Sequence, residues 1–172
     1  NYFLHPRRQE RGRSITFAAG VIDDIWGFDP AVFGIAPREA EQMDPQQRLL
    51  LETAWDALEH AGQAPESLKG TQAGVFVGVH SHSIDYCLMQ YADTSRLDAF
   101  SATGTAHDFL SGRLSYLLDL HGPSFVVDTA CSSSLVAVHL ACQSIRSGES
   151  TMAIAAGVNL MLMPGFTMAA SR

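Results

Sequence analysis

The chain has 172 residues, enough for one domain with a substantial core, and 47% of them are hydrophobic. Its formal net charge is −7, with eighteen acidic against eleven basic side chains, and its sequence pI is near 5.3. Because phosphate binding needs a basic face, this balance argues against a nucleic-acid partner. The one basic cluster, at residues 7–13, also contains Glu10 and is interpreted as a solvated loop rather than a docking patch for an acidic partner.

The three cysteines, Cys87, Cys131 and Cys142, form no C-x-x-C pair and match no metal-ligand spacing. The sequence therefore predicts neither a disulfide framework nor a metal site, and a reducing cytoplasm fits. No apolar run approaches the roughly 20 residues that a membrane-spanning helix needs, and the N-terminus carries no cleavable apolar segment. We expect a cytoplasmic protein that is neither exported nor inserted into a membrane.

The first predicted helix follows a long irregular region. Residues 1–20 have no clear hydrophobic period, and residues 21–38 mix aromatic and acidic residues with glycine and proline, which indicates an ordered but irregular connection. The helix is predicted to begin with Asp44 as N-cap and Pro45 in the first helical position, and to end at Gly62. Its expected apolar face consists of Leu49, Leu50, Thr53, Ala54, Ala57, Leu58 and Ala61.

Apolar runs then predict buried strands that alternate with helices. A strand is expected over Ala73–Val79, followed by a loop or short helix over residues 80–91 and a helix over Thr105–Leu118. Residues 125–127 are typical of a second short strand, and Thr151–Val158 of a third. This alternation indicates an α/β layered fold with largely parallel strands.

Cys131 lies where the second predicted strand turns into a helix. Beyond it, one helical face is predicted to pack in the core, and this face includes Cys142; its members are Leu135, Val138, Cys142 and Ile145. At a helix N-terminus, unpaired backbone N–H groups and the helix dipole favour a thiolate and can also hold an oxyanion. Cys131 is therefore predicted to be a nucleophile, whereas Cys87, in a loop without an activating neighbour, is assigned no role.

The residues around Cys131 are small and polar, as in a tight turn that exposes a side chain to a cleft. Asp128 is interpreted as holding backbone N–H groups of this turn with its carboxylate rather than as a catalytic acid. The predicted supporting turn and oxyanion region consists of Asp128, Thr129, Ala130, Ser132 and Ser133.

None of the seven histidines pairs with a cysteine in the sequence. His139 lies about two helical turns beyond Cys131, too far to act as its base. His80 and His82 have a His-x-His spacing without a third ligand type nearby, so we interpret them as loop residues rather than a metal pair. His107 is expected to face solvent in the first turn of a helix.

Several sequence blocks together resemble one family. The run Asp-Thr-Ala-Cys-Ser-Ser-Ser-Leu-Val-Ala at residues 128–137, with Gly-Pro-Ser upstream and Arg-Ser-Gly-Glu downstream, is similar to the active-site block of the β-ketoacyl synthases of modular polyketide synthases. Further matching blocks lie at residues 28–30, 33–35, 37–40, 43–52, 112–116 and 157–161. The resemblance covers nearly the whole chain and is weakest over residues 1–13 and 80–99.

The resemblance implies the thiolase fold, a layered α/β/α/β/α arrangement of two related halves that usually assembles as a homodimer. It implies that Cys131 accepts an acyl group from a phosphopantetheine thioester on an acyl carrier protein. Decarboxylative Claisen condensation with a malonyl-type extender follows. No bound cofactor is implied, because the substrates arrive on the phosphopantetheine of the carrier.

The family pattern also contains features that this chain lacks. Two histidines that favour decarboxylation lie in blocks beyond the nucleophile, and the chain ends at Arg172 before either block. The family's first strand is absent as well. We therefore expect residues 1–172 to be a partial β-ketoacyl synthase domain, mainly its nucleophile-bearing N-terminal half, inactive alone and exposing apolar surface where the other half packs.

Two other functions compete with this interpretation. The missing histidines favour a catalytically silent fragment that contributes only packing or dimer contacts. A cysteine hydrolase of the α/β-hydrolase type would need Gly-x-Cys-x-Gly at its nucleophile, whereas Thr129 and Ser133 occupy those positions here.

Overall fold

The structure is a computed structural model that describes residues 3–7, 10–16, 18–81 and 83–171. The basic cluster member Arg8 lies outside the described residues, as does His82 of the histidine pair. The described elements are, in chain order, α1 Pro37–Gln42, α2 Pro45–His60, η1 Pro65–Leu68, β1 Ala73–Gly78, α3 Asp85–Tyr91, η2 Thr94–Arg96, α4 Ser101–Thr105, α5 Phe109–Leu117, β2 Ser124–Val127, η3 Ala130–Ser132, α6 Ser133–Ser147, β3 Met152–Gly157 and α7 Gly165–Ala170.

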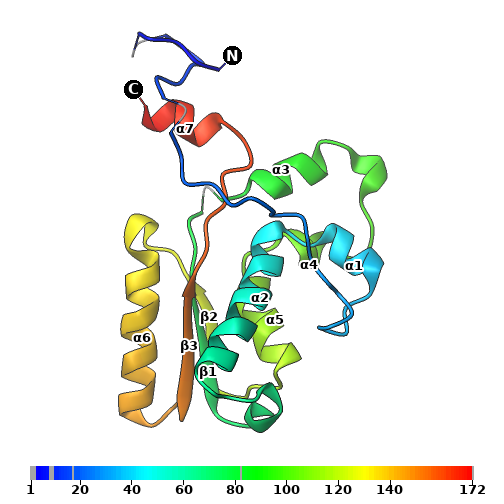
Figure 1. Cartoon of the computed structure of the whole chain (residues 1–172), viewed down its shortest axis with the longest axis vertical. Helices are drawn as coiled ribbons and strands as arrows, with labels where there is room; N and C mark the ends of the chain where they lie inside the picture. Colours follow the sequence, from blue (N-terminus) through cyan, green and yellow to red (C-terminus); the bar gives the residue numbers. More distant parts are fainter. Residues whose placement is uncertain (1–2, 8–9, 17, 82, 172) are drawn as a thin grey trace.

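The sheet has three parallel strands in the order β2-β1-β3. Val77 of β1 lies opposite Val126 on one side and Ala156 on the other, and every residue of β1 is buried. Helix α6 covers one face of the sheet, while α2 and α5 cover the other (Figure 1). The predicted α/β layering with parallel strands is confirmed.

The larger hydrophobic core lies between the sheet and α2 with α5. It is built from branched aliphatic residues of β1 and from leucines of the two helices, which is the composition expected for a parallel strand covered on both faces. Its most buried members are Met43, Leu50, Leu51, Ala54, Leu58, Ala73, Val75, Val77, Val79, Leu110 and Leu114.

Helix α2 begins where it was predicted to begin. The Asp44 side chain accepts a hydrogen bond from the Gln46 N–H over 2.8 Å, as an N-cap does. Burial raises the pKa of the Asp44 carboxyl, although hydrogen bonds from Gln46 act in the opposite direction. The predicted apolar face is only partly correct. Leu51, which was not predicted to belong to it, is buried, whereas Ala57, which was, is exposed. The buried face differs because α2 packs against both α5 and β3.

The helix predicted over Thr105–Leu118 is confirmed as α5, which runs from Phe109 to Leu117 and so begins four residues later than predicted. Helix α4 ends at Thr105, and Ala106 is extended before α5 begins at Phe109. The buried Gln47 amide explains the break: its Nε2 lies within hydrogen-bonding distance of the carbonyls of Thr103, Gly104 and Ala106. Because these carbonyls face the Gln47 amide at the end of α4, they do not accept the backbone hydrogen bonds that would join α4 and α5 into one helix.

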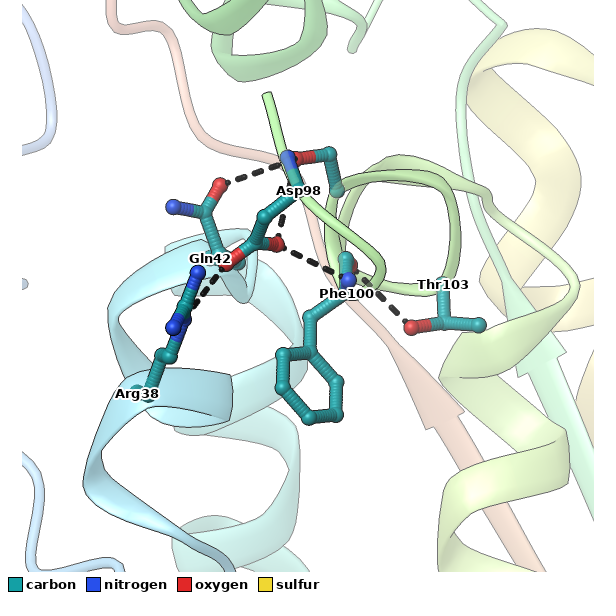
Figure 2. Close-up of polar contacts among 6 residues, drawn as sticks. Arg38, Gln42, Asp98, Phe100 and Thr103 are labelled. Carbon is teal, nitrogen blue, oxygen red and sulfur yellow. Dashed lines mark hydrogen bonds and ion pairs between the residues drawn. The ribbon is translucent and has the colours of Figure 1, made fainter. Parts of the chain in front are cut away.

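A polar cluster fixes the start of α4 against α1 (Figure 2). The Asp98 carboxylate accepts hydrogen bonds from Arg38 Nε and from the Phe100 N–H, each over 2.9 Å. The Arg38 side chain, followed by the Phe100 N–H, lowers the pKa of the Asp98 carboxyl. Ser101 adds a hydroxyl bond to Gln42 of α1 over 3.2 Å, so both helices are tied to one short loop.

Helix α6 packs on the sheet with a different face from the predicted one. Leu135 is 74% exposed, Val138 48% and Ile145 46%, and Cys142 is exposed too. The buried face is made of small residues, Ser133, Ala137, Ala141 and Ser144, and the two alanines pack on Phe76 of β1. The prediction that Cys142 packs in the core is therefore wrong.

The chain before α1 has little regular structure, as the sequence predicts. Residues 21–36 contain only turns and bends, and Phe28 stacks on Phe33 with ring centroids 5.3 Å apart. Over the described residues, no helix is both long enough and apolar enough to cross a bilayer.

Candidate active site

Cys131 lies in η3, between the end of β2 and the start of α6, and its side chain is exposed. The predicted strand–turn–helix arrangement is therefore present. Helix α6 continues directly from η3, so the Ser133 N–H bonds to the Ala130 carbonyl and the Ser132 N–H to the Thr129 carbonyl. The positive end of the α6 dipole therefore lies close to Cys131.

The residue before Cys131 has an unusual backbone conformation. Ala130 has a φ of 55°, in the left-handed region, where a non-glycine residue costs about 1–2 kcal/mol. Ser133 holds this conformation with one hydroxyl group, which donates to the Ala130 carbonyl over 2.7 Å and accepts from the Thr129 N–H over 2.9 Å. Ser132 adds a bond from its hydroxyl to the Thr129 carbonyl over 2.8 Å.

Asp128 connects this turn to the loop that follows β1. One carboxylate oxygen accepts a hydrogen bond from the Ala130 N–H over 2.8 Å, and the other accepts one from the Ser81 N–H over 2.9 Å. The Ala130 N–H, followed by Ser81, lowers the pKa of the Asp128 carboxyl and keeps it ionised. Asp128 thus holds backbone N–H groups of the turn, as its position suggests.

Two glycines allow the first turn of α6 to lie close to the sheet. A Cβ on Gly78, the last residue of β1, would lie 2.6 Å from the backbone of Ser133 and Ser134. A Cβ on Gly157, the last residue of β3, would lie 2.7 Å from the Ser134 side chain. Any larger residue at these two strand ends would push α6 and the cysteine turn away from the sheet.

A hollow of about 380 Å³ opens beside Cys131 at the carboxyl ends of the strands. This edge of a parallel sheet is where α/β proteins bind ligands. Sequence reasoning missed two of the polar residues in it, His80 and Asn159, although each follows a predicted strand. The hollow is lined by Gly78, Val79, His80, Ala130, Cys131, Ser133, Ser134, Gly157, Val158 and Asn159.

The buried side chain of Gln46 connects the two segments that follow β1 and β3. Its Oε1 accepts a hydrogen bond from the Ser83 hydroxyl over 2.5 Å and another from the Leu160 N–H over 3.1 Å. Its Nε2 lies 3.2 Å from the Ser83 carbonyl. Because Ser83 follows β1 and Leu160 follows β3, one amide fixes both segments that leave the strands beside Cys131.

The other candidate residues lie away from this turn or are placed differently than expected. His139 is exposed on α6, and Cys87 is half-buried in α3. His107, expected to face solvent, is half-buried, and its Nε2 lies 3.0 Å from the Ser83 carbonyl, because the loop after β1 folds over it. Among the described residues, no group of three or more His, Cys, Asp or Glu side chains is placed to hold a metal ion.

Comparison with solved structures places this arrangement among ketosynthases. An oxazolomycin ketosynthase domain of Streptomyces albus JA3453 matches 99% of the chain with a TM-score of 0.87 at 36% sequence identity. A ketosynthase from module 6 of the bacillaene synthase of Bacillus subtilis 168 matches 87% of the chain with a TM-score of 0.77 at 39% identity. The chain spans 29% and 24% of these two structures, and it has the thiolase-like α/β fold that they share.

Comparison with curated sequences leads to the same family. The chain is 53% identical over 169 residues to a phenolphthiocerol/phthiocerol polyketide synthase of Mycobacterium tuberculosis, and 52% identical over 163 residues to 6-methylsalicylic acid synthase of Aspergillus niger. These matches cover 98% and 95% of the chain but only 11% and 9% of the relatives. The family model described as "Beta-ketoacyl synthase, N-terminal domain" matches residues 1–172, and the chain belongs to this family.

Proposed function

We propose that this chain carries the acyl-accepting nucleophile of a polyketide β-ketoacyl synthase, and that Cys131 is this nucleophile. One observation carries the proposal: the exposed thiol of Cys131 lies at the N-terminus of α6 and opens into a hollow at the carboxyl edge of the parallel sheet. Membership of the β-ketoacyl synthase family implies the reaction class, acyl transfer followed by carbon–carbon bond formation.

In the proposed step, the Cys131 thiolate attacks the carbonyl carbon of an acyl thioester on the phosphopantetheine of an acyl carrier protein. The carbonyl oxygen becomes an oxyanion, and the backbone N–H of Cys131 belongs to the group that stabilises it. The intermediate collapses by breaking the bond to the pantetheine sulfur, which leaves as a thiolate and takes up a proton. The acyl group is then bound to Cys131, and no cofactor of the protein takes part.

The turn around Cys131 serves this step by being rigid before the substrate arrives. Asp128 and Ser133 hold Ala130 in a conformation that it would otherwise leave, so the position of the sulfur does not need to be found during the reaction. Fixed donors of this kind stabilise a developing charge without the reorganisation that water requires. We assign Asp128, Thr129, Ala130, Ser132 and Ser133 to positioning, and the chemistry to Cys131.

The condensation itself would need further parts of the domain. We propose that residues 1–172 form the nucleophile-bearing half of a larger domain, and that the exposed apolar residues of α6 pack against its other half. The exposure of Leu135, Val138 and Ile145 supports this, as does the 29% share of a solved ketosynthase that the chain spans. Assembly of the complete domain as a homodimer and a cytoplasmic location belong to the same proposal.

Acyl loading tests the proposal directly. The ketosynthase domain that carries this sequence is incubated with an acyl carrier protein whose phosphopantetheine holds a radiolabelled acyl group, and protein-bound label is measured after the carrier is removed. The label should remain on the native domain and be absent from the Cys131→Ala variant. Loading of the variant at the native rate would overturn the proposed role of Cys131.

A second measurement separates this function from a silent packing role. Release of carbon dioxide from malonyl carrier protein is followed with the chain alone and with the complete domain. We expect release from the complete domain and none from the chain alone. Sustained turnover by the chain alone would contradict the proposed division of the site, whereas no loading and no release by either protein would support the silent role.

A further inference from the structure

His80 is a second ionisable side chain in the hollow that contains Cys131. It lies two residues beyond the end of β1 and lines the hollow together with the cysteine. On its other side, the imidazole meets the edge of the Phe166 ring of α7, with ring centroids 5.8 Å apart and the planes inclined by 62°. The imidazole is therefore held at the wall of the hollow by an element far away in the sequence.

The charges around His80 come from the turn that carries the cysteine. The protonated imidazole and the Asp128 carboxylate attract each other, and the carboxylate also interacts with the Ala130 N–H and with both the N–H and the side chain of Ser81. Ser81 is the residue next to His80, so the backbone bond that anchors Asp128 also fixes the position of His80. The residue of α7 that contacts His80 is Phe166, which is uncharged. A second histidine, His107, contacts the loop after β1 through the Ser83 carbonyl.

We infer that His80 is a positioning residue for the chemistry of Cys131: its charged form makes the hollow electropositive and so favours negative charge at the cysteine sulfur and on groups that approach it. The inference deepens the proposed function, on which it rests for the role of Cys131. A positive charge in a partly enclosed hollow attracts anions more strongly than one on an open surface. An imidazole carries this charge only when it is protonated, so the effect should depend on pH.

Two alkylating reagents that differ only in charge can measure this electrostatic effect. Iodoacetate is an anion and iodoacetamide is neutral, and the thiolate attacks the iodine-bearing carbon of both and displaces iodide, so the ratio of the two rates does not depend on how much thiolate is present. The rates are measured at Cys131 by peptide mass spectrometry, at low ionic strength, between pH 5.5 and 8.5. The experiment uses the 172-residue chain in a His139→Gln background, because His139 is three residues from Cys142 on α6 and its charge would act on that cysteine. In this background the exposed Cys142 provides an internal reference for the net charge of the whole protein.

The iodoacetate-to-iodoacetamide ratio at Cys131, divided by that at Cys142, should rise about threefold or more from pH 8.5 to 5.5, the size expected for one unit charge acting across several ångströms of water. In the His80→Gln variant it should be flat, and added salt should reduce it in the native protein. The matched control is His60→Gln, which removes an exposed histidine at the end of α2 and should leave the rise intact.

A flat ratio in the native protein would overturn the inference, and so would an equal rise in the native and His80→Gln proteins. If His80→Gln does not fold, as judged by circular dichroism, His80→Asn replaces it. The inference then requires that the reagent ratio rises at low pH in the native protein and is flat in His80→Asn. The outcome is separate from acyl loading. Failure of Cys131 to accept an acyl group would remove the proposed function but leave the reagent ratio unchanged, whereas a flat ratio with normal loading would remove only the role of His80.

Discussion

The Asp128 carboxylate accepts a hydrogen bond from the Ser81 N–H over 2.9 Å, and thereby joins the loop after β1 to the turn after β2. Its second oxygen accepts the Ala130 N–H over 2.8 Å, one residue before Cys131. A single side chain therefore sets the position of the cysteine turn relative to the wall of the hollow. Substitutions in this arrangement, and in the packing that supports it, should have measurable effects on acylation and stability.

Replacing Asp128 by Asn should slow acyl transfer to Cys131. An amide offers one acceptor and one donor, so one of the two backbone N–H groups loses its partner and faces another donor. We expect the rate to fall about tenfold or more, because loss of one of these two bonds weakens the hold on Ala130 and lets the cysteine turn move. The matched control is Asp93→Asn, which changes a similar cap at η2 and should leave the rate unaltered. Equal rates for both variants would contradict the positioning role of Asp128.

Replacing Gly78 by Ala should displace the start of α6. The new Cβ would lie 2.6 Å from backbone atoms of Ser133 and Ser134, and backbone cannot move aside as a flexible side chain can. We expect a loss of about 1–3 kcal/mol in the free energy of unfolding and a larger relative loss of Cys131 acylation. Gly112→Ala, on the exposed face of α5 with no atom within 4 Å of the new Cβ, should instead be neutral or stabilising. Denaturant unfolding distinguishes the two, and an unchanged Gly78→Ala protein would refute the close approach.

Removing the Gln46 side chain should loosen both segments that leave the strands. Gln46→Ala leaves the Leu160 N–H and the Ser83 hydroxyl without their partner in a buried region, which should cost about 2–4 kcal/mol in unfolding free energy. Gln143→Ala, at an exposed position of α6, should change it by less than about 0.5 kcal/mol. The Gln46 variant should also exchange amide hydrogens faster over residues 80–84 and 158–162. Unaltered exchange there would show that other contacts hold these segments.

Two aspartates should respond to pH with opposite signs. Burial raises the pKa of Asp44 above 3.8, so ionisation of this carboxyl opposes folding above that pH. The free energy of unfolding of Asp44→Asn, relative to that of the native protein, should therefore be higher at pH 7 than at pH 3. Arg38 and the Phe100 N–H lower the pKa of Asp98 below 3.8, so its stabilisation is present above that value and is lost as pH falls through the lowered pKa. Asp98→Asn should therefore cost stability at pH 7 and less at pH 3. Urea unfolding at the two pH values checks this, and slopes of the same sign would contradict it.

The chemistry of the cysteine turn could be predicted from the sequence because it depends on neighbours in the chain. Asp128 and Ser133 reach backbone groups two to four residues away, and such contacts follow from local spacing. The orientation of α6 could not be predicted in the same way. A hydrophobic period identifies a stripe but not the layer that it faces, and here the close approach at Gly78 and Gly157 requires the small face, with Ala137 and Ala141, on the sheet.

Contacts between distant segments account for the remaining differences. The break between α4 and α5 depends on Gln47 of α2, and no local signal at residues 103–106 predicts it. His80 and Asn159 come together at Cys131 because β1 and β3 run parallel beside each other and end at the same edge. The position of each after a strand was available from the sequence, but the strand order was not.

The most direct test of the role of Cys131 is to locate the acyl group among the three cysteines. The 172-residue chain, in which Cys142 is exposed, is treated with a limiting amount of an acyl thioester of N-acetylcysteamine, digested, and mapped by mass spectrometry. We predict that the acyl group is on Cys131, while Cys142, exposed on the same helix but remote from its N-terminus, is left unmodified. Acylation of Cys142 at the same rate as Cys131, or of neither, would contradict the claim that the turn at the start of α6 makes Cys131 the nucleophile.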